Sequence, residues 1–237
     1  MDDQENEDSL WSVQFDLMSA MVFVLIIVLI AYVLNFTSNF DLRQDTAQEL
    51  SEAEARRSYI VDRVSAQLSR HGVNHEKRPR EGLIAFQENA ISFGSGSADL
   101  DSRSRQTVRR TAAALAAVLP CYTDLSDERA EALSCTSDQI NQLRHITVEG
   151  HTDNVPMRSG GSIEDNLALS LLRAAAVVRE LESHDPLMNL ETEGSEAIFS
   201  AAGYGERRPL VQHREPTSDQ RNRRIELRFT LRGPNLF

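Results

Sequence analysis

The sequence predicts an α+β protein in which a single N-terminal transmembrane helix and a helical linker precede a two-layer α/β sandwich. One uncharged apolar run is long enough for a membrane helix. The next segment repeats apolar residues at helical spacing, and the C-terminal part alternates strand-like with helix-like segments. We expect five parts: a cytoplasmic tail 1–12, a transmembrane helix 13–36, a linker 37–81, the sandwich 82–232 and a short tail 233–237.

The apolar run extends from Leu17 to Phe36 without a charged residue. About 20 such residues are what a helix needs to cross a hydrocarbon core roughly 30 Å thick. Acidic rather than basic residues precede the run, and no small-residue cleavage site follows it. We therefore expect an uncleaved anchor rather than a secretory signal.

Asp16 stands at the start of this run. A carboxylate within a membrane helix is costly unless it is paired, hydrated or protonated, which makes Asp16 a functional candidate. Alternatively, Asp16 is an interfacial residue that the helix dipole favours and headgroups hydrate. Ser19 and Ala20 share its helix face, and small residues let another helix approach closely. This pattern favours a place inside a helix bundle.

The chain has 237 residues and a formal charge of −11. That balance, without a basic patch, argues against direct nucleic-acid binding. The two cysteines, Cys121 and Cys135, flank a polar, acidic stretch. They suggest a disulfide in an oxidising compartment, which would place the C-terminal domain outside the cytoplasm. Two unrelated buried thiols are the alternative.

The expected elements are helices, where apolar residues recur at helical spacing, and strands, where apolar and polar residues alternate. Residues 41–71 predict a helix whose thin apolar stripe suits either a self-associating stalk or a helix packed on the domain. The period-2 pattern at 224–231 predicts a strand with one buried and one wet face. The remaining expectations are strands at 83–86, 145–150 and 198–202, an extended segment at 90–93, and helices at 101–119 and 163–182.

Four ordered motifs lie in the C-terminal part: I-S-F-G-S-G-S-A-D-L at 91–100, G-H-T-D at 150–153, N-x-x-L-S-x-x-R-A at 166–174 and N-R-R-I-E-L at 222–227. Together they resemble the peptidoglycan-binding domain of the OmpA family. The resemblance implies an OmpA-like fold and a site for the diaminopimelate of a cell-wall stem peptide. The loop 155–163 is longer than in compact members of that family, and the cysteine loop is an insertion.

Diaminopimelate carries both an ammonium and a carboxylate group. The resemblance implies that Asp153 accepts the ammonium and that Arg173 binds the carboxylate with its planar fork. It also implies supporting roles for Asn166 and Leu169 along the groove, for Thr152 and Asn154 in the loop, and for Arg223 nearby. Arg223 and Arg224 can equally be exposed strand residues.

The residue types also suggest two other chemistries. His145 and His151 invite a metal interpretation, but no third ligand follows at suitable spacing, so we expect no metal site. Ser170 with His151 and Asp153 supplies the residue types of a hydrolytic triad. No nucleophile-elbow motif supports it, and Ser170 has a place in the motif of the wall-binding family, so we expect neither an enzyme nor a cofactor.

The membrane motif F-D-L-M-S-A-M at 15–21 is similar to that of the MotB family of ion-driven motor stators. This resemblance implies that Asp16, with Ser19 on its face, carries a translocated proton or sodium ion. It implies a homodimer inside a ring of a multi-span MotA-like subunit. It also implies a single-pass protein of the bacterial inner membrane, with a cytoplasmic N-terminus and a periplasmic C-terminal domain.

The short acidic tail and short linker depart from flagellar stators toward the ZorB subunits of Zorya anti-phage defence systems, whose partner is ZorA. We expect a ZorB-like motor subunit. A flagellar MotB-type stator and a motor-independent tether between inner membrane and wall remain alternatives.

Overall fold

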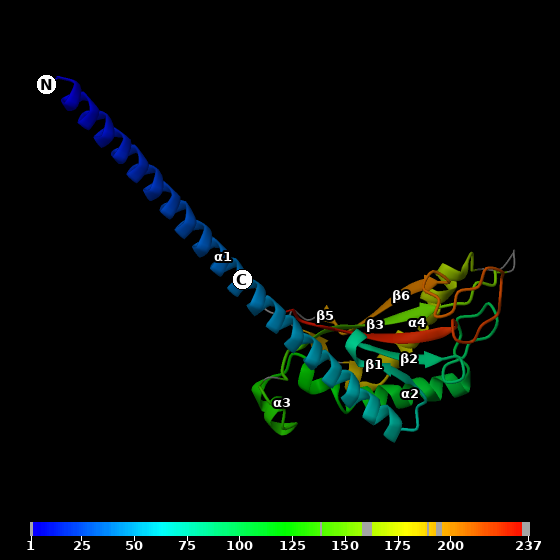
Figure 1. Ribbon diagram of the computed structural model, residues 1–237. Helices are drawn as coiled ribbons and strands as arrows, with labels where there is room; N and C mark the ends of the chain where they lie inside the picture. Colours follow the sequence, from blue (N-terminus) through cyan, green and yellow to red (C-terminus); the bar gives the residue numbers. More distant parts are fainter. Residues whose placement is uncertain (1, 138, 158–162, 189, 193–195, 234–237) are drawn as a thin grey trace. The chain divides into compact units, whose positions relative to one another are not determined.

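The computed structural model describes residues 2–137, 139–157, 163–188, 190–192 and 196–233 (Figure 1). Of these, the side chains of residues 2–16, 37–47 and 49 are not described, so the expected role of Asp16 falls outside the described side chains. The chain divides into two compact units, Met1–Ser51 and Glu52–Phe237.

The first unit is helical. It consists of the N-terminal part of α1 (Asp2–Arg70). Within it, Leu17–Phe36 is a 20-residue stretch with a mean hydropathy of 3.0, none of it buried. The length and composition of this stretch suit a membrane span. The expected apolar helix is confirmed.

The second unit is built on a five-stranded sheet with the order β1-β2-β7-β3-β6. Only β3 and β6 pair in parallel; the other pairs are antiparallel. The strands are β1 (Glu76–Arg78), β2 (Leu83–Gln87), β3 (Leu143–His151), β6 (Phe199–Gly205) and β7 (Arg224–Leu231), and a small second sheet pairs β4 (Glu191–Thr192) with β5 (Glu196–Ala197). The four expected strands are confirmed. The segment at 90–93 forms only the bridge Phe93–Leu100.

Two long helices, α2 (Ser102–Ala116) and α4 (Asn166–Glu182), pack with the sheet. Their first residues are set by capping carboxylates: Asp101 accepts from the Ser104 amide at 2.6 Å and Asp165 from the Ala168 amide at 2.7 Å. Because Asp165 caps α4, that helix begins three residues later than its apolar pattern predicts. The short helices are η1 (Pro79–Glu81), η2 (Leu119–Tyr122), α3 (Asp127–Ala132) and α5 (Asp185–Met188).

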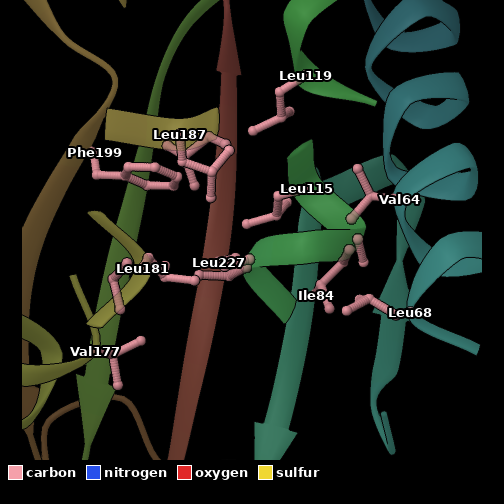
Figure 2. Packing of buried hydrophobic residues seen from close by; sticks show 14 of the residues in the cluster. Val64, Leu68, Ile84, Leu115, Leu119, Val177, Leu181, Leu187, Phe199 and Leu227 are labelled. Atoms are coloured by element: carbon pink, nitrogen blue, oxygen red, sulfur yellow. The ribbon is translucent and has the colours of Figure 1, made fainter. Parts of the chain in front are cut away.

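The C-terminal part of α1 belongs to the core of this unit. Figure 2 shows Val64 and Leu68 beside Leu115 and Ile84, and all four side chains are fully buried. For residues 60–68, this packing supports a helix packed on the domain and not a self-associating stalk. The compact unit therefore starts at Glu52, earlier than the expected residue 82, because the apolar stripe of the helix covers part of the core.

The other face of β7 carries charged side chains, some of which are buried. Arg224 donates to Glu226 at 2.7 Å, and Arg228 donates to Glu149 at 2.6 Å. Arg224 is 6% exposed and Glu226 is 3% exposed. The expectation of a wet face on β7 is wrong at Arg224 and Glu226, and so is the alternative that Arg224 is an exposed strand residue; Arg228 on the same face is partly exposed. Charged groups lie there with little exposure because each has an ionic partner.

A disulfide joins Cys121 to Cys135 with Cα atoms 5.3 Å apart. It closes the loop that carries α3. The pairing expected from the two cysteines is confirmed.

Candidate functional site: a charged cluster at the end of β3

The site forms where β3 packs directly on α4. A Cβ at Gly150 would overlap the carbonyl oxygen of Ser170, and one at Gly203 of β6 would lie 2.5 Å from the Leu171 amide nitrogen. Glycine in both strands therefore permits an approach that no side chain would allow. This contact brings the end of β3, which leads to Asp153, close to the helix that carries Arg173.

Asp153 follows β3 and is 8% exposed. Its Oδ2 pairs with Nη1 of Arg223. The Val155 amide approaches Oδ1 at 3.4 Å, a long hydrogen bond. The carboxylate that we expect to accept an ammonium group is thus already paired with a cation of the chain.

Arg173 reaches from α4 to the loop between β2 and α2. Its Nε donates to the Ser97 carbonyl at 2.9 Å, and Nη2 donates to the Gly94 carbonyl at 3.1 Å. The guanidinium carbon lies 5.0 Å from the centre of the Phe93 ring, which is a cation–π contact. Burial lowers the pKa of Arg173, while the charges of Glu88 and Asp153 oppose that shift. With its usual pKa so far above neutrality, Arg173 stays charged.

Glu88 is the member of the cluster that sequence reasoning missed. Its carboxylate accepts two hydrogen bonds from Arg223, at 2.9 Å from Nε and 2.6 Å from Nη2. These bonds and those to Asp153 raise the pKa of Arg223. In strand pairing, Gln87 of β2 lies opposite Arg224 of β7, so Glu88 and Arg223 are the next residues outward. No local pattern in the sequence indicates that β2 and β7 are neighbours.

The loop around the site is fastened by side-chain amides. Asn154 donates to the Glu215 carbonyl at 3.0 Å and accepts from the Thr217 amide at 2.8 Å. Asn166 donates to the Val155 carbonyl at 3.0 Å. These two residues, expected at the loop and groove, hold main chain in place.

The other expected residues lie inside the fold. Thr152 is 3% exposed, and its amide donates to the Gly205 carbonyl at 3.0 Å. Leu169 is also buried, at 3% exposure. Ser19, expected in the ion path, lies in the separate first unit, on an exposed and mainly apolar surface of α1. The structure brings Asp153, Arg173 and Arg223 together in the second unit.

A cavity of about 10 Å³ lies within the cluster, lined by Glu88, Phe93, His151, Arg173 and Arg223 among others. This is room for about one water molecule. A larger pocket of about 300 Å³ lies on the neighbouring loop and includes Thr152, Asn154 and His213 in its lining. The two carboxylates and two guanidiniums of the cluster sum to zero charge, which suits a ligand that bears both signs.

Metal chemistry has one candidate group among the described residues. Ligand atoms of Glu149, His151 and Glu226 lie within 4.8 Å of one another. Arg228 and Arg224 already pair with the two carboxylates, so a cation there would meet two guanidinium groups. The arrangement is that of an ion-pair network and does not favour a metal.

Ser170, considered as a nucleophile, is fully buried. Its hydroxyl donates to the Leu167 carbonyl at 2.8 Å and accepts from the Gly205 amide at 2.8 Å. These bonds tie α4 to the end of β6. The Ser170 hydroxyl therefore has a structural role.

The comparisons with known proteins agree with this fold. Residues 119–223 match the model of the OmpA family. The chain is 28% identical over 157 residues to Motility protein B of Bacillus subtilis, a match that covers 66% of this chain and 48% of that protein. The chain thus spans about half the length of this curated relative.

Among solved structures, the fold is similar to that of a MotB-like protein from Desulfovibrio vulgaris, with a TM-score of 0.50 and 20% identity over 79% of this chain and 98% of that one. This likeness confirms the α+β fold with an N-terminal apolar helix, a helical region and an OmpA-like sheet-and-helix domain. The region matched to the OmpA family includes Asp153, Arg173 and Arg223, whereas Asp16 and Glu88 lie outside it.

Proposed function

We propose that this chain is the wall-anchored stator subunit of an ion-driven inner-membrane motor. Two features support the proposal: an apolar helix long enough to span a bilayer and a neutral cluster of paired charges in an OmpA-like domain. The similarity to Motility protein B agrees with both. The observation that carries the wall-binding part is that Arg223 pairs with Asp153 and lines, together with Arg173, the same small cavity.

The ligand we propose is the diaminopimelate of the peptidoglycan stem peptide. Asp153 accepts its ammonium and Arg173 binds its carboxylate, with Asn154 and Asn166 holding the loop in place. Charge-assisted hydrogen bonds of this kind are about twice as strong as neutral ones. Binding at both ends selects a zwitterionic group over a simple amine or acid.

Pelleting of the purified full-length protein with isolated sacculi tests this assignment. Asp153→Ala and Arg173→Ala are each expected to reduce binding at least tenfold, because each removes one charged contact. Asp124→Ala and Arg110→Ala, at exposed positions that line neither cavity, are the matched controls and should bind as the wild type does. Undiminished binding by both cluster variants would overturn the wall-anchor proposal.

In the membrane, we propose that Asp16 carries the translocated ion on a homodimer surrounded by a MotA-like subunit. Protonation removes the carboxylate charge, and with it much of the cost of burial in the bilayer. The proposed orientation has the N-terminus in the cytoplasm, and the disulfide supports it because such a bond suits an oxidising periplasm. The exposed apolar residues around Ser19 offer a face for a neighbouring helix.

Asp16→Asn separates a motor from a passive tether. The variant should lose the cellular function. Its amount in the cell, its association with the MotA-like partner and its binding to sacculi should stay unchanged. Asp8→Asn, which changes a carboxylate in the acidic tail, is the matched control and should retain function. A fully functional Asp16→Asn variant would leave the tether as the better account.

We further propose a role in a Zorya-type anti-phage defence system. The support is the short connection: residues 37–51 separate the apolar stretch from the compact unit. Deletion of the gene should then raise phage plating without changing swimming. A loss of swimming with unchanged plating would favour a flagellar stator instead.

A further inference from the structure

Arg223 divides its three guanidinium nitrogens between two carboxylates. Nε and Nη2 bind Glu88, at 2.9 and 2.6 Å, while Nη1 binds Asp153 and the Ser218 hydroxyl, the latter at 2.7 Å. Since the planar fork is occupied by Glu88, the direction of Nη1 is set by that pair. Glu88 therefore orients the group that covers Asp153.

The two ends of the cluster differ in how they are occupied. The contacts recorded for Arg173 are two main-chain carbonyls and the Phe93 ring, which carry no net charge. Asp153, in contrast, is paired with a full positive charge. A ligand carboxylate can approach Arg173 without displacing an anion, but a ligand ammonium must compete with Arg223.

We propose that Glu88 is a positioning residue that determines the selectivity of this site for ligands bearing an ammonium group. Glu88 retains Arg223 when an ammonium takes its place on Asp153, so Arg223 keeps a carboxylate partner. It also supplies the second negative charge, which keeps the four-residue cluster neutral. This inference rests on the proposed wall-binding function and adds a residue that lies outside the matched family region.

Removing the charge of Glu88 and removing the charge of Arg223 should shift the ligand selectivity of the site in opposite directions. In Glu88→Gln, Arg223 has only Asp153 as its carboxylate partner, and the cluster carries a net positive charge. In Arg223→Gln, Asp153 is uncovered and the cluster carries a net negative charge. The double variant Glu88→Gln/Arg223→Gln restores neutrality with Asp153 and Arg173 alone.

Calorimetric titration of the full-length protein in detergent micelles tests the proposal with three probes. They are meso-diaminopimelate, pimelate without ammonium groups, and 1,5-diaminopentane without carboxylates. We expect Glu88→Gln to weaken diaminopimelate binding roughly tenfold and to raise the pimelate-to-diaminopentane preference. Arg223→Gln should lower that preference, and the double variant should recover diaminopimelate affinity to within about threefold of wild type.

The controls separate the proposed role of Glu88 from the proposed wall-binding function. Glu54→Gln, an exposed carboxylate on α1, should behave as wild type, and circular dichroism should show equal folding for every variant. Should Glu88→Gln fold poorly, Arg223→Gln and the charge-retaining Glu88→Asp decide the question by the same preference ratio. Unchanged selectivity in the cluster variants, with Asp153→Ala still abolishing binding, would overturn the role of Glu88 alone. Absence of diaminopimelate and sacculus binding in the wild type would overturn the wall-binding function.

Discussion

Gly150 of β3 packs against the carbonyl of Ser170 on α4 so closely that a methyl group at position 150 would overlap that oxygen. Ser170 in turn bonds the Gly205 amide of β6 at 2.8 Å. One helix turn is thereby held to two neighbouring strands. The contact sets the depth of α4 on the sheet and, with it, the position of Arg173 relative to Asp153.

Gly150→Ala is therefore expected to destabilise the domain. The new methyl group must push α4 from the sheet, and overpacking of this kind costs about 1–3 kcal/mol of unfolding free energy. Thermal unfolding followed by circular dichroism measures the change. Gly233→Ala is the matched control, because nothing lies within 4 Å of a Cβ there. Equal melting temperatures for the two variants would contradict the close contact.

Leu68→Ala tests whether the end of α1 is part of the domain core. Leu68 is fully buried, so truncation should lower the unfolding free energy by about 2–5 kcal/mol through lost burial and a residual cavity. Leu50→Ala, at a position 59% exposed, should have little effect. If both variants melt as the wild type does, residues 60–68 act as a separate stalk.

The disulfide should contribute measurably to stability. Joining Cys121 to Cys135 restricts the unfolded chain, and a loop of about 15 residues corresponds to roughly 3 kcal/mol in the chain-entropy model. Cys121→Ser/Cys135→Ser should therefore melt at a lower temperature than the oxidised wild type. Reductant should lower the melting temperature of the wild type and leave the variant unchanged. A wild type insensitive to reductant would argue against the contribution.

Acid should remove a stabilising contribution from Glu226. Burial alone would raise its pKa, but His151 and Arg224 outweigh burial and lower the pKa from 4.5 to about 2. Because the folded pKa is the lower one, this contribution is present above pH 4.5 and is lost as the pH falls toward 2. Glu226→Gln should be less stable near pH 7 and should lose less stability over that acidic interval.

Thermal unfolding between pH 2 and 7 measures this difference, read as wild type minus variant so that other titrating groups cancel. Glu54→Gln, which changes an exposed carboxylate, should follow the wild-type curve throughout. A Glu226→Gln curve parallel to that of the wild type would show that the carboxylate does not contribute through its lowered pKa.

Local patterns in the sequence were enough to predict the longer elements, and the resemblance to a known family supplied three members of the cluster. The apolar run 17–36, the alternation in β7 and the helical stripe of α4 are patterns among near neighbours, so their periods can be read directly. Asp153, Arg173 and Arg223 were identified by motif resemblance. The disulfide followed because the chain has only two cysteines.

Contacts between distant segments were decided only by the tertiary structure. Glu88 meets Arg223 because β2 pairs with β7, and residues 60–68 of α1 enter the core because an apolar surface of the sheet domain receives them. Burial of Arg224 and Glu226 likewise depends on groups from other segments: Arg224 donates to the Arg208 carbonyl, and His151 lies beside Glu226. Periodicity shows which face of an element is apolar or polar, but what covers that face is determined by strand order and long-range packing.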